Sequence, residues 1–313
     1  MRLHLIDGTY ELYRAHFAPR PGHQGPTGQD LKATVGVVAS LLALLHDPAE
    51  DVTHLAVAFD NPIRSFRNDR FPPYKSDEGV PPELRVQFDT VEGAVRALGV
   101  DVWSMREHEA DDGLATGARL FRDQVDQVRI MTPDKDLGQC IVGARVVQVD
   151  RRQQKVTDET AFRARRGFPP RSMPDYLALT GDTADGIPGL RGFGEKSAGM
   201  IIGAYERLEA IPDDVASWRV TPRGAAQLAA TLAAGRADAL LYRELATLVE
   251  TAPVTTSLDD LRFRGVPRAR FEAWCRTVGA STLATAPRRW EATTADVTGA
   301  PVVSELDDDE KSS

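Results

Sequence analysis

Two hydrophobic patterns alternate along the first 150 residues. Four short apolar runs have the length of buried strands: residues 3–6, 54–59, 128–131 and 145–149. Three longer stretches repeat apolar residues at helical spacing: residues 31–46, 82–98 and 109–125. Strands that alternate with helices are joined by right-handed crossovers. The pattern therefore predicts an α/β fold with a mostly parallel sheet that is covered on both faces.

A different pattern begins near Gly167, where the strand runs stop. Glycine and proline break the following chain into four short helical stretches: residues 174–179, 197–208, 224–233 and 237–248. From about Ala284 onward, Thr, Ala, Asp and Glu dominate without periodicity, which predicts disorder. We therefore expect a parallel-sheet core over residues 1–170, a helical module over 171–283 and an acidic disordered tail over 284–313.

Acidic residues follow the predicted strands. Asp7 and Asp60 come directly after two of the apolar runs, and Asp134 and Asp136 follow a third after a Thr-Pro turn. The carboxyl ends of parallel strands meet at one edge of a sheet, where ligands bind in α/β folds. The next predicted helix also opens with acids: Glu109, Asp111 and Asp112. The topology thus predicts that seven carboxylates converge.

A single aspartate at a strand end usually caps a helix or closes a turn. Seven carboxylates at one edge repel one another, so such a cluster is costly unless cations neutralise it. Carboxylate oxygens without histidine or cysteine favour Mg²⁺ or Mn²⁺ over zinc. We therefore expect a divalent-cation site.

A second stretch, residues 179–198, combines acids with glycines. Asp182 and Asp185 are three residues apart and can complete the cation site from the helical module. Three glycines and a lysine then surround the start of a predicted helix: Gly189, Gly192, Gly194 and Lys196. Small residues at a helix N-terminus let backbone N–H groups approach phosphates, and the lysine adds positive charge.

Composition adds less. The 313 residues are 42% hydrophobic and 27% charged, and the two cysteines, Cys140 and Cys275, form no metal-binding spacing, which favours a reducing compartment. No apolar stretch of about 20 residues occurs, and the charge at Asp7 comes too early for a signal peptide. We expect a cytoplasmic protein. Residues 291–313 contribute −6 of the net charge of −8, so the charge does not identify a partner.

In order and spacing, these motifs resemble the bacterial form of the 5′-nuclease (flap endonuclease) family, found in the N-terminal nuclease domain of DNA polymerase I and in stand-alone versions. The resemblance spans about residues 1–250. The residues that carry it are Leu5-Ile6-Asp7-Gly8 with Tyr13-Arg14, Phe59-Asp60 with Ser65-Phe66-Arg67 and Tyr74-Lys75, Glu109-Ala110-Asp111-Asp112, Thr132-Pro133-Asp134-Lys135-Asp136-Leu137, and Thr180 through Ala198.

The resemblance implies a PIN-like nuclease core followed by a helix-three-turn-helix module that binds duplex DNA. It implies that the nine acids hold two divalent metal ions, Mg²⁺ or Mn²⁺, and that a potassium ion binds at the glycine loop. The implied reaction is two-metal hydrolysis of DNA near 5′ ends or flaps on duplex, as in primer or flap removal during replication or repair. The implied protein is a monomer that acts at the nucleoid.

The resemblance also assigns basic residues. Lys75 and Arg67 are expected to hold the scissile phosphate. Further DNA contacts are expected at Arg14, Arg64, Tyr74 and Arg85, and at the glycine loop with Lys196. In one departure, Glu78 stands where the family often has arginine. The sequence therefore leaves open the preference among flaps, nicks, recessed ends and RNA/DNA hybrids.

Three other functions share part of this pattern. A phosphatase of the haloacid dehalogenase type, suggested by Asp7-Gly8-Thr9, needs a nucleophilic aspartate at position 5, where Leu5 stands. A non-catalytic DNA-structure-binding protein on the same fold would be favoured by missing acids, and none is missing. A PIN-type ribonuclease usually lacks the glycine-loop module.

Overall fold

The computed structural model describes residues 1–292, and its centre is a six-stranded sheet in the order β3-β2-β1-β4-β5-β6. The strands are β1 (Arg2–Asp7), β2 (His54–Asp60), β3 (Asp101–Met105), β4 (Gln127–Met131), β5 (Val146–Asp150) and β6 (Lys155–Thr157). The first five run parallel, and β6 is antiparallel to β5. The predicted α/β fold is confirmed. The apolar runs predict four strands but not β3 or β6, which contain polar residues.

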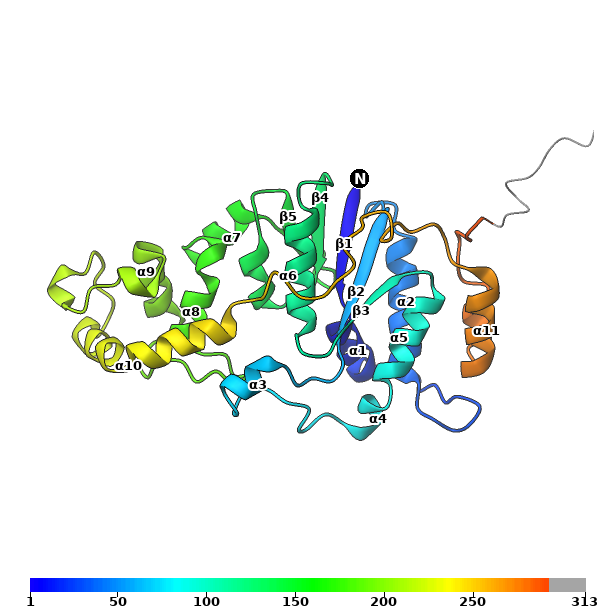
Figure 1. Cartoon of the computed structure of the whole chain (residues 1–313), viewed down its shortest axis with the longest axis horizontal. Helices are drawn as coiled ribbons and strands as arrows, with labels where there is room; N and C mark the ends of the chain where they lie inside the picture. The colour runs from blue at the N-terminus through cyan, green and yellow to red at the C-terminus, as the bar shows by residue number, and fades with distance from the viewer. Residues whose placement is uncertain (293–313) are drawn as a thin grey trace, which may run out of the picture.

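Helices cover both faces of the sheet (Figure 1). Alternate residues of the strands point to opposite faces, so that Leu5 and Ala58 pack under one layer and Ile6 and Phe59 under the other. The first layer is α6 (Ala110–Phe121). The second contains α1 (Gly8–Phe17), α2 (Lys32–Leu45), α5 (Phe88–Ala97) and α11 (Arg268–Val278). Two buried cores therefore hold the strand ends in fixed positions.

A helical module with its own core lies at one end of the molecule (Figure 1). Its helices are α7 (Glu159–Arg166), α8 (Met173–Thr180), α9 (Glu195–Tyr205) and α10 (Ala225–Ala246). The last one joins two predicted helices across a kink at Gly235. Short 3₁₀ turns connect the elements: η1 (Lys135–Cys140), η2 (Pro170–Ser172), η3 (Leu208–Ala210), η4 (Val215–Ser217) and η5 (Ser281–Leu283).

The segment between β2 and α5 passes along one side of both parts and contains α3 (Phe66–Arg70) and α4 (Pro82–Arg85) (Figure 1). The backbone N–H of Lys75 donates to the carbonyl of Asp185 over 3.0 Å. This segment is therefore tied directly to the loop that follows α8.

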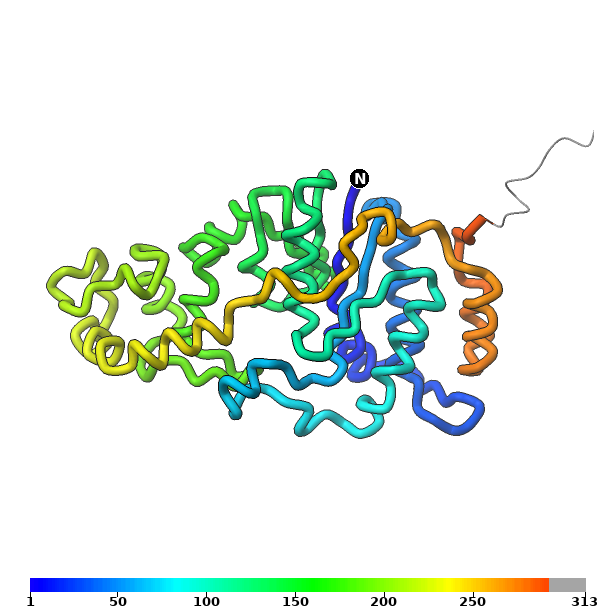
Figure 2. Tube along the Cα trace, viewed as in Figure 1, coloured from blue at the N-terminus to red at the C-terminus, as the bar shows by residue number. Residues whose placement is uncertain are grey.

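After α10 the chain runs back across α6 to the sheet (Figure 2). Leu55 N–H donates to Leu261 O over 2.9 Å, and Phe263 N–H donates to Thr53 O over 3.0 Å. Phe271 of α11 is fully buried in the core that also contains Leu55 and Phe59 of β2. The module predicted over residues 171–283 therefore includes a final segment that packs on the sheet instead.

The predicted start of the disordered tail at Ala284 is too early in the chain. Glu291 N–H donates to Val266 O over 3.0 Å, and the Arg268 guanidinium lies 4.1 Å from the centre of the Trp290 ring. Residues 284–292 are thus held by α11 and the segment before it, because Trp290 supplies an apolar anchor. The rest of the predicted tail, residues 293–313, lies outside the described residues.

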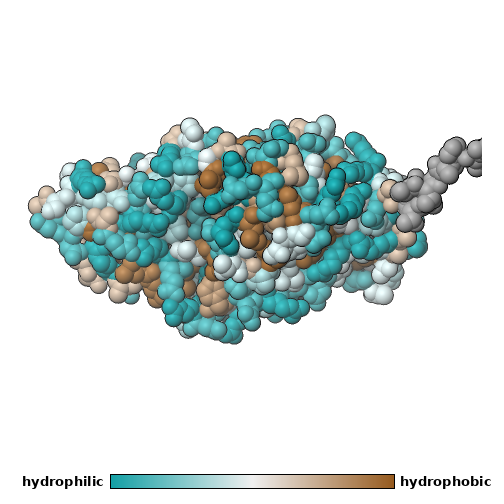
Figure 3. All heavy atoms as spheres, turned by 45° about the horizontal axis from the view of Figure 1, so that its top comes forward, coloured by the Kyte–Doolittle hydropathy of each residue, from teal (hydrophilic) through white to brown (hydrophobic). Residues whose placement is uncertain are grey.

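The face shown in Figure 3 is mostly hydrophilic, with apolar side chains gathered in its central part. Among residues 1–292, no helix is both long and apolar enough to cross a membrane.

Candidate active site

The sequence places carboxylates at the carboxyl edge of the sheet, and β1 and β2 bring the first two together. Asp7 ends β1 and caps α1: its carboxylate accepts from Tyr10 N–H over 2.8 Å and from the Thr132 hydroxyl over 2.9 Å. Asp60 ends β2 and accepts from Ala110 N–H over 2.8 Å. These hydrogen bonds fix both carboxylates relative to the start of α6 and the end of β4.

The pKa values of these acids are raised by one another's charges. Burial, together with the charges of Asp60 and Asp134, raises the pKa of Asp7 to about 7 against the effect of two hydrogen bonds. Burial also raises the pKa of Asp111 well above its usual range, with Asp134, Asp7 and Asp60 adding to the effect. Asp60, Asp7, Asp111 and Asp134 are thus close enough to repel one another. We call these four residues the first acidic group.

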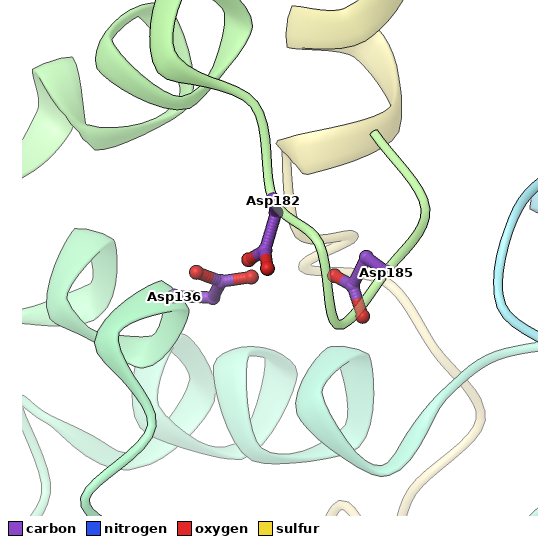
Figure 4. Close-up of side chains that lie close together, drawn as sticks. All are labelled: Asp136, Asp182 and Asp185. Atoms are coloured by element: carbon purple, nitrogen blue, oxygen red, sulfur yellow. The ribbon is translucent and has the colours of Figure 1, made fainter. Parts of the chain in front are cut away.

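A second acidic group consists of Asp136, Asp182 and Asp185. Oxygens from the three carboxylates lie within 4.8 Å of one another, and Figure 4 shows them facing a common point from η1 and from the loop after α8. Burial raises the pKa of Asp136 well above its usual range, and Asp134 adds the largest charge effect. Asp134, a member of the first acidic group, therefore also acts on the charge of the second.

Two lysines neutralise part of this negative charge. Lys75 Nζ lies 2.9 Å from Glu109 Oε2 and 3.1 Å from Asp185 Oδ1. Burial alone would lower the pKa of Lys75, but these two carboxylates raise it well above its usual range. Lys135 Nζ pairs with Asp182 and lies 3.4 Å from Asp136 Oδ1. Two ammonium groups thus pair with these carboxylates and partly neutralise their negative charge.

Lys135 is the site residue that the sequence analysis missed. It stands between Asp134 and Asp136 in the chain, and the 3₁₀ turn η1 returns its ammonium group to Asp182 of the helical module. Its position inside the Thr132–Leu137 motif was the available signal.

Arg67 and Asp112 differ from their predicted roles. Both side chains are fully buried, and Arg67 donates from Nη1 and Nη2 to the two oxygens of Asp112, each over 2.7 Å. The N–H groups of Glu109 and Val249 also donate to Asp112. Arg67 therefore has no surface from which to contact a phosphate, and the Asp112 oxygens are already occupied. In this structure the pair is a buried structural contact.

Tyr74, predicted to contact DNA, is also buried. Its side chain is 4% exposed, and its hydroxyl donates toward Glu109 and Asp185 over 3.3 Å each. Glu109 additionally accepts from the Ser65 hydroxyl over 2.7 Å. Tyr74 and Ser65 therefore orient the Glu109 carboxylate through hydrogen bonds, and Tyr74 does not face a ligand.

The other basic contacts predicted in the sheet part lie outside the acidic groups. Arg14 is half-buried and donates to the carboxylate of Glu11. Arg64 and Arg85 are exposed, and each pairs with a nearby aspartate of its own segment. Among the predicted basic residues, all of which lie in the described part of the chain, Lys75 alone reaches the acidic groups directly.

The glycine loop is built as a tight turn before α9. Asp182 and Ile187 exchange two backbone hydrogen bonds of 2.8 Å, and Gly189 has a φ of +69° with backbone of Gly181 so close that a side chain would collide. Gly194 caps α9, where Lys196 is exposed. Asp182 and Asp185 of the second acidic group therefore lie in the same loop as the glycines before α9, whereas Asp136 comes from η1.

The donors fit divalent cations. Both groups consist of aspartates without a histidine or cysteine, which is the donor set that Mg²⁺ and Mn²⁺ prefer, and in the second group the oxygens lie close enough to share one ion. Within residues 1–292, the buried Asp136 Oδ1 accepts no hydrogen bond, and the cation that faces it is the Lys135 ammonium at 3.4 Å. The raised pKa values of Asp7, Asp111 and Asp136 show that positive charge would be strongly favoured here.

Comparison with family models covers nearly the whole described chain. Residues 2–167 match the model described as "5'-3' exonuclease, N-terminal resolvase-like domain", and residues 168–269 match "5'-3' exonuclease, C-terminal SAM fold". The boundary between the two models falls just after α7, the first helix of the helical module.

Curated relatives are similar to this chain over most of its length. DNA polymerase I of Bacillus caldotenax is 32% identical over 287 residues, which are 89% of this chain and 31% of the polymerase. DNA polymerase I of Mycobacterium tuberculosis is 34% identical over 269 residues, 84% of this chain and 29% of the polymerase. The chain thus spans about a third of the length of these relatives.

Solved structures share the fold. A 5′-exonuclease of phage T5 with bound zinc has a TM-score of 0.60 at 16% identity, covering 79% of this chain and 89% of its own. The catalytic core of Rad2, in complex with a DNA substrate, has a TM-score of 0.59 at 14% identity, covering 90% of each chain. With two family models matching end to end, the chain belongs to the 5′-3′ exonuclease family.

Proposed function

We propose that this chain hydrolyses DNA phosphodiester bonds near 5′ ends, as a 5′-3′ exonuclease and 5′-flap endonuclease that depends on two divalent cations. The observation that carries the proposal is the second acidic group, whose three carboxylates lie within 4.8 Å of one another and are affected by the charge of Asp134 from the first acidic group. The family membership supports the reaction type, and the phage T5 relative was solved with metal ions and DNA.

The first acidic group together with Glu109 would hold one cation, and the second acidic group would hold the other. When bound, divalent cations stabilise charge on the scissile phosphate and lower the pKa of an attacking water. Asp134 is positioned to serve both sites. The hydrogen bonds from Tyr10, Thr132 and Ala110 keep the carboxylates in place, so little reorganisation is needed when cations bind.

Lys75 is the residue we assign to the scissile phosphate. Its ammonium lies between Glu109 and Asp185, and its side chain is 23% exposed, so it faces both the acids and solvent. Once cations neutralise the carboxylates, the ammonium becomes free to pair with a phosphate oxygen. Arg67 is not part of this proposal, because Asp112 occupies it.

Duplex DNA would bind at the glycine loop and α9. Lys196 is exposed beside the first N–H groups of α9, which together favour a phosphate. Backbone carbonyls of this loop and the Ser197 hydroxyl, which bonds Gly194, are oxygen donors suited to a potassium ion. Arg14, Arg64 and Arg85 remain proposed contacts to the DNA backbone.

The proposed setting is primer or flap removal in replication or repair, by a monomer acting at the nucleoid in the cytoplasm. The similarity to part of DNA polymerase I supports the setting.

The test uses end-labelled 5′-flap, nicked, recessed, blunt and single-stranded DNAs, and an RNA/DNA hybrid, with Mg²⁺ or Mn²⁺ and with excess chelator. Short 5′ products that need the cation support the proposal. DNA binding without cleavage would instead favour the non-catalytic function, and cleavage of RNA alone would favour the ribonuclease.

A second measurement concerns Lys75. Lys75→Ala should lower single-turnover cleavage by about 100-fold or more, the usual effect of removing one charge-stabilising donor. Arg122→Gln, which removes a charge at the far end of α6 from the acids, is the matched control and should cleave at the native rate. Equal rates for Lys75→Ala and the native chain would exclude the assigned role.

A further inference from the structure

A cavity of about 720 Å³ lies beside the acidic groups, and the function proposed above uses only Tyr10, Arg14 and Thr132 of its lining. Its walls come from α1 and α2 on one side and from β4, β5 and the β5–β6 turn on the other. The size is within the range of small-molecule sites. We call it the α1–β5 cavity.

Arginines dominate its polar lining. Five of them, Arg14, Arg20, Arg129, Arg151 and Arg152, stand against three acids, Glu11, Asp47 and Glu50. Arg129 and Glu50 pair at 2.8 Å and neutralise each other. The remaining lining carries more positive than negative charge, in a chain whose net charge is −8. The cavity therefore favours an anion.

The arginines nearest to α1 are held in place by a buried carboxylate. Glu11 is 2% exposed and pairs with both Arg14 and Arg151. Both guanidinium groups also donate to the Ser40 hydroxyl, over 2.8 and 3.0 Å. One buried acid thus orients two cations toward the cavity, so this part of the wall is preorganised for an anion and retains a net positive charge.

The floor is apolar, which a bare phosphate does not require. Met131, Val149 and Val156 line it, and Val156 on β6 is 47% exposed. Tyr10 stands at the opposite side, and burial raises the pKa of its hydroxyl. Apolar and aromatic surface next to arginines matches a ligand with a flat ring system and a phosphate, that is, a nucleotide.

The cavity reaches the carboxyl edge of the sheet, because Thr132 and Pro133, which follow β4, are among its lining residues. Tyr10 and Thr132 both line it, and the same two residues donate to the Asp7 carboxylate. A nucleotide in the cavity would therefore lie next to residues that contact Asp7 of the first acidic group.

We propose that the α1–β5 cavity binds a single nucleotide, with its phosphate at Arg14, Arg151 and Arg152 and its base on the apolar floor. The inference rests on the proposed function, because DNA at the acidic edge makes nucleotides the local ligand. The occupant is either a free mononucleotide released by cleavage or an unpaired nucleotide of the bound strand.

The experiment measures binding of thymidine 5′-monophosphate and of a thymidine trinucleotide to the whole chain by titration calorimetry. Excess chelator is present, so that phosphates do not bind through cations at the acidic groups. The test variant combines Arg152→Gln with Val156→Asp, which alter two exposed positions and leave the buried Glu11 network intact. Arg122→Gln is the matched charge control.

We expect saturable binding to the native chain and to Arg122→Gln, and at least tenfold weaker binding to the double variant at an unchanged melting temperature. Thymidine without phosphate, and inorganic phosphate alone, should each bind at least tenfold more weakly than the nucleotide. Cavity-dependent binding of the mononucleotide identifies a free nucleotide as an occupant, and cavity-dependent binding of the trinucleotide alone identifies a strand.

Failure of both ligands to bind, or equal binding by the double variant, overturns the proposal. The same preparations are assayed for Mg²⁺-dependent cleavage of a 5′-flap substrate. Cleavage without cavity-dependent binding refutes only the cavity, whereas nucleotide binding without cleavage refutes the proposed nuclease function.

Discussion

Arg67 and Asp112 form a fully buried pair with two parallel hydrogen bonds of 2.7 Å. The Arg67 guanidinium also donates to the carbonyls of Leu245 and Thr247, and Asp112 accepts from Val249 N–H over 2.8 Å. The pair thereby joins the segment after β2 to the first turn of α6 and to the end of α10. Its role is to hold these three segments together.

Arg67→Met should lower the free energy of unfolding by about 3–5 kcal/mol, because it leaves the Asp112 carboxylate buried without a partner. Denaturant unfolding followed by circular dichroism measures the change. Arg64→Gln, in an exposed pair with Asp69, is the control and should cost less than about 1 kcal/mol. Similar losses of unfolding free energy for the two variants would show that the buried Arg67 pair stabilises the fold no more than an exposed pair does.

Asp134→Ala should abolish single-turnover cleavage while DNA affinity is retained or increased. Asp134 interacts with both acidic groups, so its loss weakens both cation sites, and it also removes one charge that repels phosphate. Single-turnover rates and binding titrations on the same flap substrate test this. Asp123→Ala, at an exposed position just after α6, serves as control. Near-native cleavage by Asp134→Ala would contradict the two-cation assignment.

Lys196→Ala should weaken duplex binding equally for all sequences and reduce the salt dependence by about one phosphate contact. The lysine is exposed at the start of α9 and would contact backbone charge instead of bases. Cleavage at saturating DNA should persist, since Lys196 is not among the residues of the acidic groups. Affinities at several salt concentrations provide the slope, and an unchanged slope would mean that α9 is not the duplex contact.

Deletion of residues 293–313 should leave stability and cleavage unchanged, whereas Trp290→Ala should lower the free energy of unfolding by about 1–2 kcal/mol. The Trp290 ring packs against the Arg268 guanidinium at 4.1 Å and lies beside the core of the sheet part. Melting temperatures of the two variants separate these expectations. If the deletion lowers the melting temperature and Trp290→Ala does not, Trp290 is not the residue that holds the end of the chain to the sheet part.

The sequence predicts the acids better than the basic residues, for a physical reason. Asp7 and Asp60 follow buried strands, so parallel pairing alone brings them to one edge. The environment of Arg67 depends on Thr247 and Val249, which reach the Arg67–Asp112 pair only through tertiary packing. The return of the chain to the sheet was also missed, although Leu261-Arg262-Phe263-Arg264 alternates apolar and polar residues, because so short a run is a weak strand signal.

The return of the chain to β2 also determines when the sheet part can finish folding. Thr53 and Leu55 receive their hydrogen-bond partners from residues 261–263, and Phe271 is buried in the same core as Leu55. The helical module is therefore an insertion within one discontinuous unit, and during synthesis it leaves the ribosome before that unit is complete. Contacts across about 200 residues of chain make this closure a slow, late event. The sheet part would thus reach its final packing only after Phe271 has left the ribosome.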